Sequence, residues 1–184
     1  LKGDVDLKAL AKKTVDDAIL KANAGLVETG KYNVVLDAKQ MRTILSVYSS
    51  AFSAKMAQMG MSLLAGKEGE KIASECVAVV DDPLGERNPA RTHFDGEGVA
   101  TYTKNVVENG VLKTLLYDLA SAHKAGVKST ANGQRASYAQ QVNIAPFTFY
   151  IKGGELSEDE LLAKMGDGIY VTELKSFSAT NAVT

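Results

Sequence analysis

The side chains able to do hydrolytic or metal chemistry are few in this chain. Its only two histidines, His93 and His123, stand far apart on different predicted elements. Two imidazoles that bind zinc from one helix follow an HExxH-type spacing, and the sequence contains no such pair. His93 lies close to Asp95, whose carboxylate could hold one ring nitrogen. A lone loop histidine is nevertheless more often a simple hydrogen-bonding residue than a ligand or a base.

Nucleophiles and oxygen ligands give no clearer signal. No Gly-x-Ser-x-Gly elbow is present, so serine, histidine and aspartate are not arranged as in a hydrolase. The single cysteine, Cys76, falls within the apolar run 75–80, where a thiol is normally inert packing. Acidic residues gather between Asp81 and Glu97 without the calcium-loop spacing, which favours a solvated loop. Side-chain chemistry alone therefore identifies no active enzyme.

The composition excludes several classes of protein. There are 21 basic and 22 acidic residues and no tryptophan, which argues against a nucleic-acid-binding surface. No apolar run is long enough to span a bilayer, and one cysteine cannot form an internal disulfide. We therefore expect a globular protein of the cytoplasm that contacts neither nucleic acid nor membrane.

The first half of the chain is predicted to be mainly helical. Apolar residues at helical spacing predict an amphipathic helix over 4–24, capped by Asp4 and ended by Gly25. A short strand over 32–36 precedes a long helix from about 38 to 60, whose methionine-rich apolar stripe suits a core. A cofactor or lipid groove is the alternative for that stripe. The run 75–80 is predicted to be a buried strand.

After a polar loop over 81–98 the pattern changes to that of strands. Runs over 99–107 and 111–117 flank Asn109-Gly110, the strongest short hairpin signal. A helix over 118–125 ends at Gly126, and a capping box at Ser157 and Glu160 opens another helix. Further strands are expected over 147–151 and 169–174. The order indicates an α+β fold, with N-terminal helices followed by a mostly antiparallel, barrel-like β-sheet domain that contains the Asn-Gly hairpin.

Six segments in order resemble the C-terminal half of TldD/PmbA proteins. They are 69–74 (GEKIAS), 79–82 (VVDD), 94–99 (FDGEGV), 108–113 (ENGVLK), 119–133 (LASAHKAGVKSTANG) and 165–174 (MGDGIYVTEL). The resemblance implies that residues 1–30 are a linker helix from a preceding domain. Residues 31–184 would then be a C-terminal-type domain that stops before its last strands.

The resemblance also implies where a metal site should lie. TldD-type members carry HExxxH on a helix, with two zinc-binding histidines and a glutamate base. Counting back without gaps from Gly69-Glu70 puts that motif on Leu45, Ser46 and Ser50, and these residues do not ligate zinc. PmbA-type (TldE-like) members also lack the motif. We therefore expect no catalytic residue, metal or cofactor in this chain, with zinc only in a TldD-type partner.

The implied function is that of a non-catalytic subunit in a metallopeptidase system for proteolysis or peptide maturation. It would pair with a TldD-like subunit, or form a homodimer, and handle a peptide or an unfolded polypeptide. An extended peptide could add to an edge of the hairpin over 99–117. Two alternatives stay open: a self-sufficient hydrolase that uses His93 or His123, and a binding module that contacts gyrase, after the family's older label of DNA gyrase modulator.

The candidates for contact with substrate or partner are polar residues in two loops. A purely structural loop is the alternative reading for the second of these loops, which covers 129–135. The candidates are His93, Asp95, Ser129, Thr130, Asn132 and Arg135.

Overall fold

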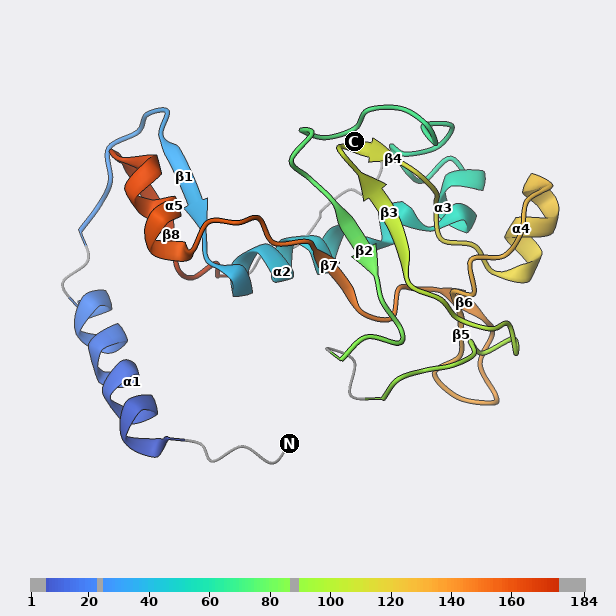
Figure 1. The fold of residues 1–184 in the computed structure, drawn as a ribbon, viewed down its shortest axis with the longest axis horizontal. Coiled ribbons are helices and arrows are strands. Elements are labelled where there is room, and N and C mark those ends of the chain that lie inside the picture. The colour runs from blue at the N-terminus through green and yellow to red at the C-terminus, as the bar shows by residue number, and fades with distance from the viewer. Residues whose placement is uncertain (1–5, 23–24, 87–89, 176–184) are drawn as a thin grey trace. The chain divides into compact units, whose positions relative to one another are not determined.

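The computed structural model describes residues 6–22, 25–86 and 90–175, which fall in two compact units, Leu1–Tyr32 and Asn33–Thr184 (Figure 1). The first unit contains helix α1 (Leu7–Ala22). Asp6 begins this helix, because its carboxylate accepts hydrogen bonds from the backbone amides of Lys8 and Ala9, both at 3.0 Å. The helix is as predicted; the expected cap, Asp4, lies outside the described residues.

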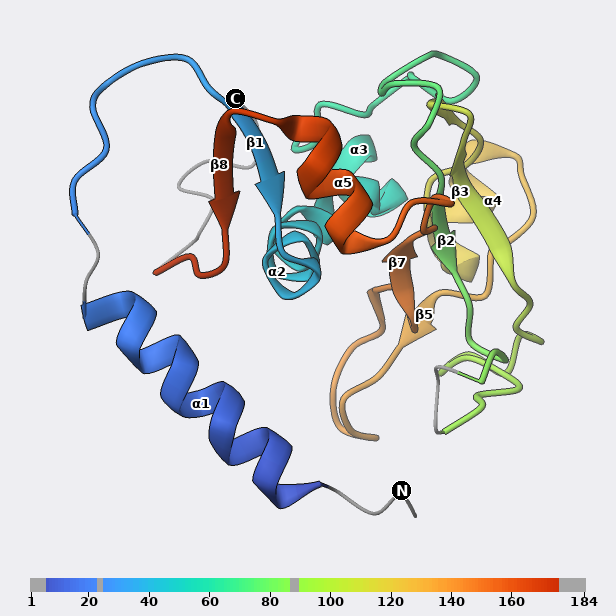
Figure 2. The same cartoon turned by 60° about the vertical axis from the view of Figure 1, so that its left-hand side comes forward.

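In the second unit, strands β1 (Asn33–Leu36) and β8 (Gly168–Val171) pair in parallel, and helix α5 (Glu158–Met165) lies beside them (Figure 2). The predicted capping box opens α5: the Ser157 backbone amide donates to Glu160 at 2.8 Å, and the Glu160 amide donates to the Ser157 hydroxyl at 3.3 Å. This parallel pair is a departure from the antiparallel pattern expected of the strands.

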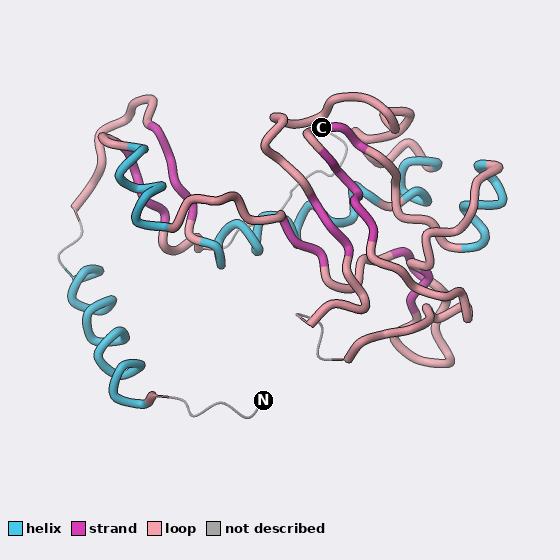
Figure 3. The backbone as a smooth tube through the Cα atoms, viewed as in Figure 1, coloured by secondary structure: helices cyan, strands magenta, loops and turns pink. Residues whose placement is uncertain are grey.

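The main sheet has four strands in the order β4-β3-β2-β7, and all neighbours are antiparallel. A separate two-stranded pair, β5 with β6, was not predicted. Figure 3 shows how much loop connects these short strands. No closed barrel forms among the described residues, but the α+β class is confirmed. The strands are β2 (Val79–Asp81), β3 (Lys104–Glu108), β4 (Val111–Leu112), β5 (Gly133–Gln134), β6 (Asn143–Ile144) and β7 (Phe149–Ile151).

The long helix expected over 38–60 is wrong, because the segment is broken into three pieces. These are α2 (Ala38–Tyr48), the 3-10 helix η1 (Ser49–Phe52) and α3 (Ala54–Gln58). The break forms where the backbone pairs with a distant segment: Ala54 N donates to Leu116 O at 2.9 Å, and Leu116 N donates to Phe52 O at 2.8 Å. Ser53 is extended there, and its hydroxyl caps α3. Tertiary backbone hydrogen bonds therefore override local helix propensity.

The core lies between the main sheet and the broken helical segment. Phe52 packs edge-on against Phe149 of β7, with ring centroids 5.3 Å apart, and Val106, Leu112 and Leu116 are completely buried around them. No helix among the described residues has both the length and the apolar character to cross a membrane.

Helix α4 (Leu119–Ala125) is as predicted. Asp118 caps it by accepting from the Ser121 amide at 2.7 Å, and Gly126 ends it with φ of 71°. This helix contacts α3, since the Gln58 side-chain amide donates to Ser121 O at 2.8 Å.

The predicted hairpin is confirmed, with shorter strands. Asn109 and Gly110 form the two-residue turn, with φ of 50° and 75°, between β3 and β4. Strand β4 stops pairing with β3 soon after Leu112. The reason is that Leu116, further along the chain, pairs with Ser53 between η1 and α3.

Gly110 is also in close contact with another loop. Its N–H donates to Val77 O at 2.9 Å, and its carbonyl accepts from Ile72 N at 2.8 Å. A Cβ atom at this position would collide with the carbonyl oxygens of Ala73 and Ser74, and would lie 2.7 Å from the latter. The position therefore requires glycine both for its positive φ and for space.

We predict that Gly110→Ala lowers the free energy of unfolding by about 3 kcal/mol, from the left-handed backbone conformation and the collision together. Gly60→Ala is the matched control, because Gly60 has φ of 72° and no atom within 4 Å of the added Cβ. It should cost only about 1 kcal/mol. Denaturant unfolding of both variants measures the difference, and equal losses would contradict a steric role for the neighbouring loop.

Candidate functional site

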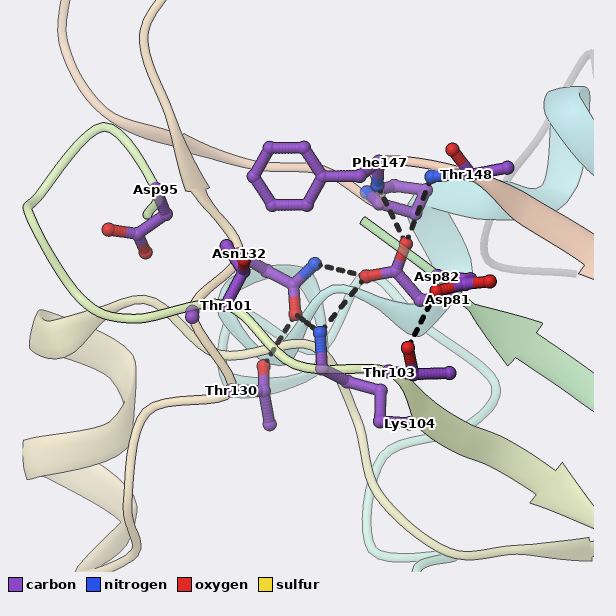
Figure 4. A network of polar contacts seen from close by, with 12 residues as sticks. Asp81, Asp82, Asp95, Thr101, Thr103, Lys104, Thr130, Asn132, Phe147 and Thr148 are labelled. Carbon is purple, nitrogen blue, oxygen red and sulfur yellow. Dashed lines mark hydrogen bonds and ion pairs between the residues drawn. The ribbon is translucent and has the colours of Figure 1, made fainter. Parts of the chain in front are cut away.

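A buried network of polar contacts surrounds Asp81, at the end of β2 (Figure 4). Its carboxylate has no exposed surface and accepts four hydrogen bonds. Oδ1 accepts from the backbone amides of Phe147 at 2.8 Å and Thr148 at 3.2 Å. Oδ2 accepts from Asn132 Nδ2 at 2.7 Å and from Lys104 Nζ at 3.2 Å. The carboxylate therefore joins β2, β3, the 130–133 segment and the chain that leads into β7.

Asn132 uses every hydrogen-bonding position of its amide. Besides Asp81, its Nδ2 donates to Ala145 O at 3.1 Å. Its Oδ1 accepts from Lys104 Nζ at 3.3 Å and from the Thr130 hydroxyl at 2.8 Å. Because this side chain is completely buried, each of these contacts replaces a lost contact with water.

Lys104 lies on β3 and is 5% exposed. Burial lowers the pKa of its ammonium group, and the neighbouring charge of Asp81 opposes that shift. The ammonium also lies over the ring of Tyr102, 4.8 Å from its centroid. Lys104 is thus surrounded by Asp81, Asn132 and an aromatic ring.

This buried network has no free group that would hold a ligand. Among the described residues, no buried side-chain nitrogen or oxygen is without a hydrogen-bond partner. Thr130 and Asn132, predicted to contact substrate, therefore hold the fold together. Through Asn132 they hold the carboxylate of Asp81 in place, and that carboxylate in turn binds the backbone amides of the segment before β7.

Asp95 and His93, two further candidates, are not paired with each other. Asp95 is 5% exposed, and its carboxylate accepts from the backbone amides of Glu97, Val99 and Gly133 at 2.9 to 3.0 Å. His93 is exposed, with no side-chain partner among the residues the structure describes. The expectation that this carboxylate could hold the imidazole is wrong, because backbone amides use it instead.

The remaining candidates of the second loop differ in exposure. Ser129 is half-buried, and its hydroxyl donates to Tyr117 O at 3.1 Å and accepts from Ala131 N at 3.1 Å. Arg135 is exposed and points to no carboxylate in the described part of the chain. Ser129 therefore shapes its loop, whereas the Arg135 side chain is exposed and has no partner among the described residues.

The predicted hairpin does not offer a free sheet edge. Gly69 N donates to Leu112 O at 2.7 Å, and Leu112 N donates to Glu70 O at 3.0 Å, so the loop at 69–73 covers the outer side of β4. A peptide cannot add there without displacing this loop. The expectation of an available edge within 99–117 is therefore wrong.

At the opposite edge of the sheet, β7 pairs with no further strand among the described residues, although helix α2 contacts this strand. Lys152 N donates to Ala78 O, and Asp82 N donates to Thr148 O, so the even-numbered residues of this strand face β2. In an antiparallel ladder the alternate residues point their backbone groups the other way. The amides and carbonyls of Phe149 and Ile151 therefore face outward, and the described residues supply them with no partner.

The positions that the family resemblance assigns to a zinc motif do not fit a metal. Leu45 on α2 packs against the core, and Ser46 and Ser50 are exposed on either side of the end of that helix. An aliphatic side chain has no donor atom, and neutral hydroxyls are not normal zinc ligands. In the described part of the chain, no three His, Cys, Asp or Glu residues gather closely enough to hold a metal ion.

Two other reactive residues lie apart from this network. Cys76 is exposed and outside β2, so its predicted place in a buried strand is wrong. His123 is exposed in the last turn of α4.

The sequence does not predict that Asp81 and Lys104 form a buried ion pair. Asp81 directly follows an apolar run, and Lys104 stands two positions before Val106-Val107. Such positions do not reveal whether a charged side chain turns inward.

We predict unequal costs for removing the two partners of this buried ion pair. Asp81→Ala leaves the buried ammonium without its counter-charge and two backbone amides without an acceptor, and should lower the free energy of unfolding by about 4 kcal/mol. Lys104→Met leaves Asp81 with three donors and should cost about half as much. Lys113→Met, which breaks the exposed pair of Lys113 and Glu108 at 3.6 Å, is the control and should cost under about 1 kcal/mol.

A double-mutant cycle by urea unfolding tests this prediction. The combined Asp81→Ala and Lys104→Met variant should lose less free energy of unfolding than the sum of the losses in the two single variants. The reason is that the double variant removes both charges, whereas each single variant leaves one charge buried without its partner. Simple additivity would contradict the coupling of this pair.

The comparisons with known proteins agree on one family. A sequence profile described as the PmbA/TldA metallopeptidase C-terminal domain matches residues 29–184. A metalloprotease of Methanothermobacter thermautotrophicus is 32% identical over 90% of this chain, which spans 36% of that protein. These matches confirm the resemblance to TldD/PmbA proteins.

Two solved structures share the fold, each with a TM-score of 0.88 over 98% of this chain. One is a Thermotoga maritima protein described as a proposed modulator of a DNA gyrase, 32% identical; the other is TldE from Thermococcus kodakarensis, 26% identical. The chain spans 41% of each, well under half of their length. With sequence profile, relatives and fold in agreement, this chain belongs to the PmbA/TldA metallopeptidase family, and residues 29–184 match that family's C-terminal domain.

Proposed function

We propose that this chain acts as the non-catalytic member of a peptidase assembly, working with a family member that carries HExxxH and zinc. The observation that carries the proposal is the state of α2: Leu45, at the position of the first histidine, is a partly buried side chain that packs against the core. Similarity to TldE, at 26% identity over nearly the whole chain, supports the same role.

The unpaired edge of β7 supports a role in holding the substrate. An extended peptide can pair with the outward backbone groups of Phe149 and Ile151, and main-chain pairing tolerates many sequences. The Asp81 network fixes the segment that enters this strand through the amides of Phe147 and Thr148. The edge is thus held in an extended form before any peptide binds, which reduces the entropy lost on binding.

The subunit role predicts where zinc and activity will be found. The purified chain should contain no stoichiometric zinc and should not cleave an unstructured peptide, because its α2 lacks imidazole ligands. Adding it to an HExxxH-bearing relative should raise the cleavage rate of that relative at least about tenfold, since the substrate site would then be complete. Metal analysis and a fluorogenic peptide assay of each protein alone, and of the mixture, measure both quantities. Chelator-sensitive cleavage by this chain alone would refute the proposal.

The edge role predicts a selective effect at Ile151. Ile151→Pro removes the outward amide while leaving the hydrogen bonds to β2 in place, and should raise the KM of the assembly for an unstructured peptide about fivefold, as expected for one lost hydrogen bond. Ile151→Val keeps the amide and should leave KM unchanged. Thermal unfolding checks that both variants fold. Equal KM values for the two folded variants would rule out strand addition at β7.

A further inference from the structure

A second feature, a cleft of about 310 Å³ between α3 and α4, has a lining suited to a charged small ligand. Lys55 and Gln58 are three positions apart on α3, and Ser121 and Lys124 are three apart on α4. Residues with this spacing share one helix face, so both faces are turned toward the cleft. The hydrogen bond from Gln58 Nε2 to Ser121 O at 2.8 Å holds the two helices together.

The two lysines in the cleft have free ammonium groups. Lys55 and Lys124 are exposed, and within the described part of the chain neither has an ion pair or hydrogen bond from its ammonium group. The three ion pairs seen among these residues involve other lysines, Lys71, Lys104 and Lys113. Two unpaired cations in one cleft attract a single anionic group more strongly than either does alone.

Two carboxylates also line the cleft, and one oxygen of each accepts hydrogen bonds from the chain. Asp118 Oδ1 accepts from the amide and the hydroxyl of Ser121, at 2.7 and 2.6 Å. Glu97 Oε2 accepts from Leu119 N at 2.8 Å. Neutral N–H and O–H donors therefore fix the orientation of these two acids. Their negative charges remain in the cleft, but neither acid lies within ion-pair distance of Lys55 or Lys124.

We infer that this cleft binds the C-terminal carboxylate of a short peptide, with Lys55 and Lys124 on the carboxylate. Glu97 Oε1, which accepts no hydrogen bond from the described residues, can accept an N–H of the same ligand. The volume is large enough for a few residues of peptide. The choice of a peptide as ligand rests on the proposed function; the choice of a carboxylate rests on the two lysines.

The test uses the chain alone, with trialanine as probe, followed by backbone NMR shifts at Ser121 and Lys124 and by calorimetry. Trialanine with a free carboxylate should bind at least about tenfold more tightly than trialanine amide, because the amide carries no negative charge. Lys55→Met and Lys124→Met should each weaken binding about fivefold, and raised salt should weaken it further. Lys128→Met, an exposed lysine outside the cleft, is the matched control and should bind as the unmodified chain does.

Equal affinity for the acid and the amide, no binding of either, or shifts that persist in both lysine variants would overturn the inference. Inorganic phosphate that binds as tightly as trialanine would overturn the assignment to a peptide carboxylate. No partner protein or cleavage enters this measurement. If the chain binds trialanine but does not activate an HExxxH-bearing relative, only the proposed function is refuted. If it activates the relative but does not bind trialanine, only the inference about the cleft is refuted.

Discussion

The buried carboxylate of Asp81 connects parts of the second unit that are remote in sequence. Its four donors come from β3, from the 130–133 segment and from the chain entering β7, up to 67 positions away. A carboxylate without water is stable only when every lone pair meets a donor. The arrangement is therefore close to all-or-none: the three segments must be in place together for the charge to be tolerated. An apolar contact at the same point would tolerate small shifts of each segment.

Short-range features of this fold could be predicted from the sequence because their causes are local. The Asn109-Gly110 turn, the Asp118 cap and the Ser157–Glu160 box each depend on residues within a few positions of one another. The break between α2 and α3 could not be predicted in this way. The break depends on backbone hydrogen bonds to Leu116, and the sequence of residues 49–53 does not predict that these residues will pair with Leu116. The same holds for the loop at 69–73 that covers β4.

The candidate site was harder to predict than the fold, for a related reason. A polar side chain in a loop binds either a ligand or another part of the chain, and the two cases look alike in sequence. Thr130, Asn132 and Asp95 turned out to serve the chain itself, and all three are buried. Among the described residues, the groups without a partner include backbone atoms at Ile151 and the ammonium ends of Lys55 and Lys124. Backbone atoms have no sequence signature, and these lysines are brought together only by the packing of α3 on α4.

The parallel pairing of β1 with β8 has a consequence for the order in which the unit assembles. Gln40, just after β1, bonds to Thr172 O, just after β8, across 132 positions of chain. Closing so long a loop costs entropy before any contact compensates for it. No residue of β1, α2, α5 or β8 is fully buried, so the compensation is small. The part of the unit formed by β1 and β8 should therefore assemble last during folding and open first in the native state.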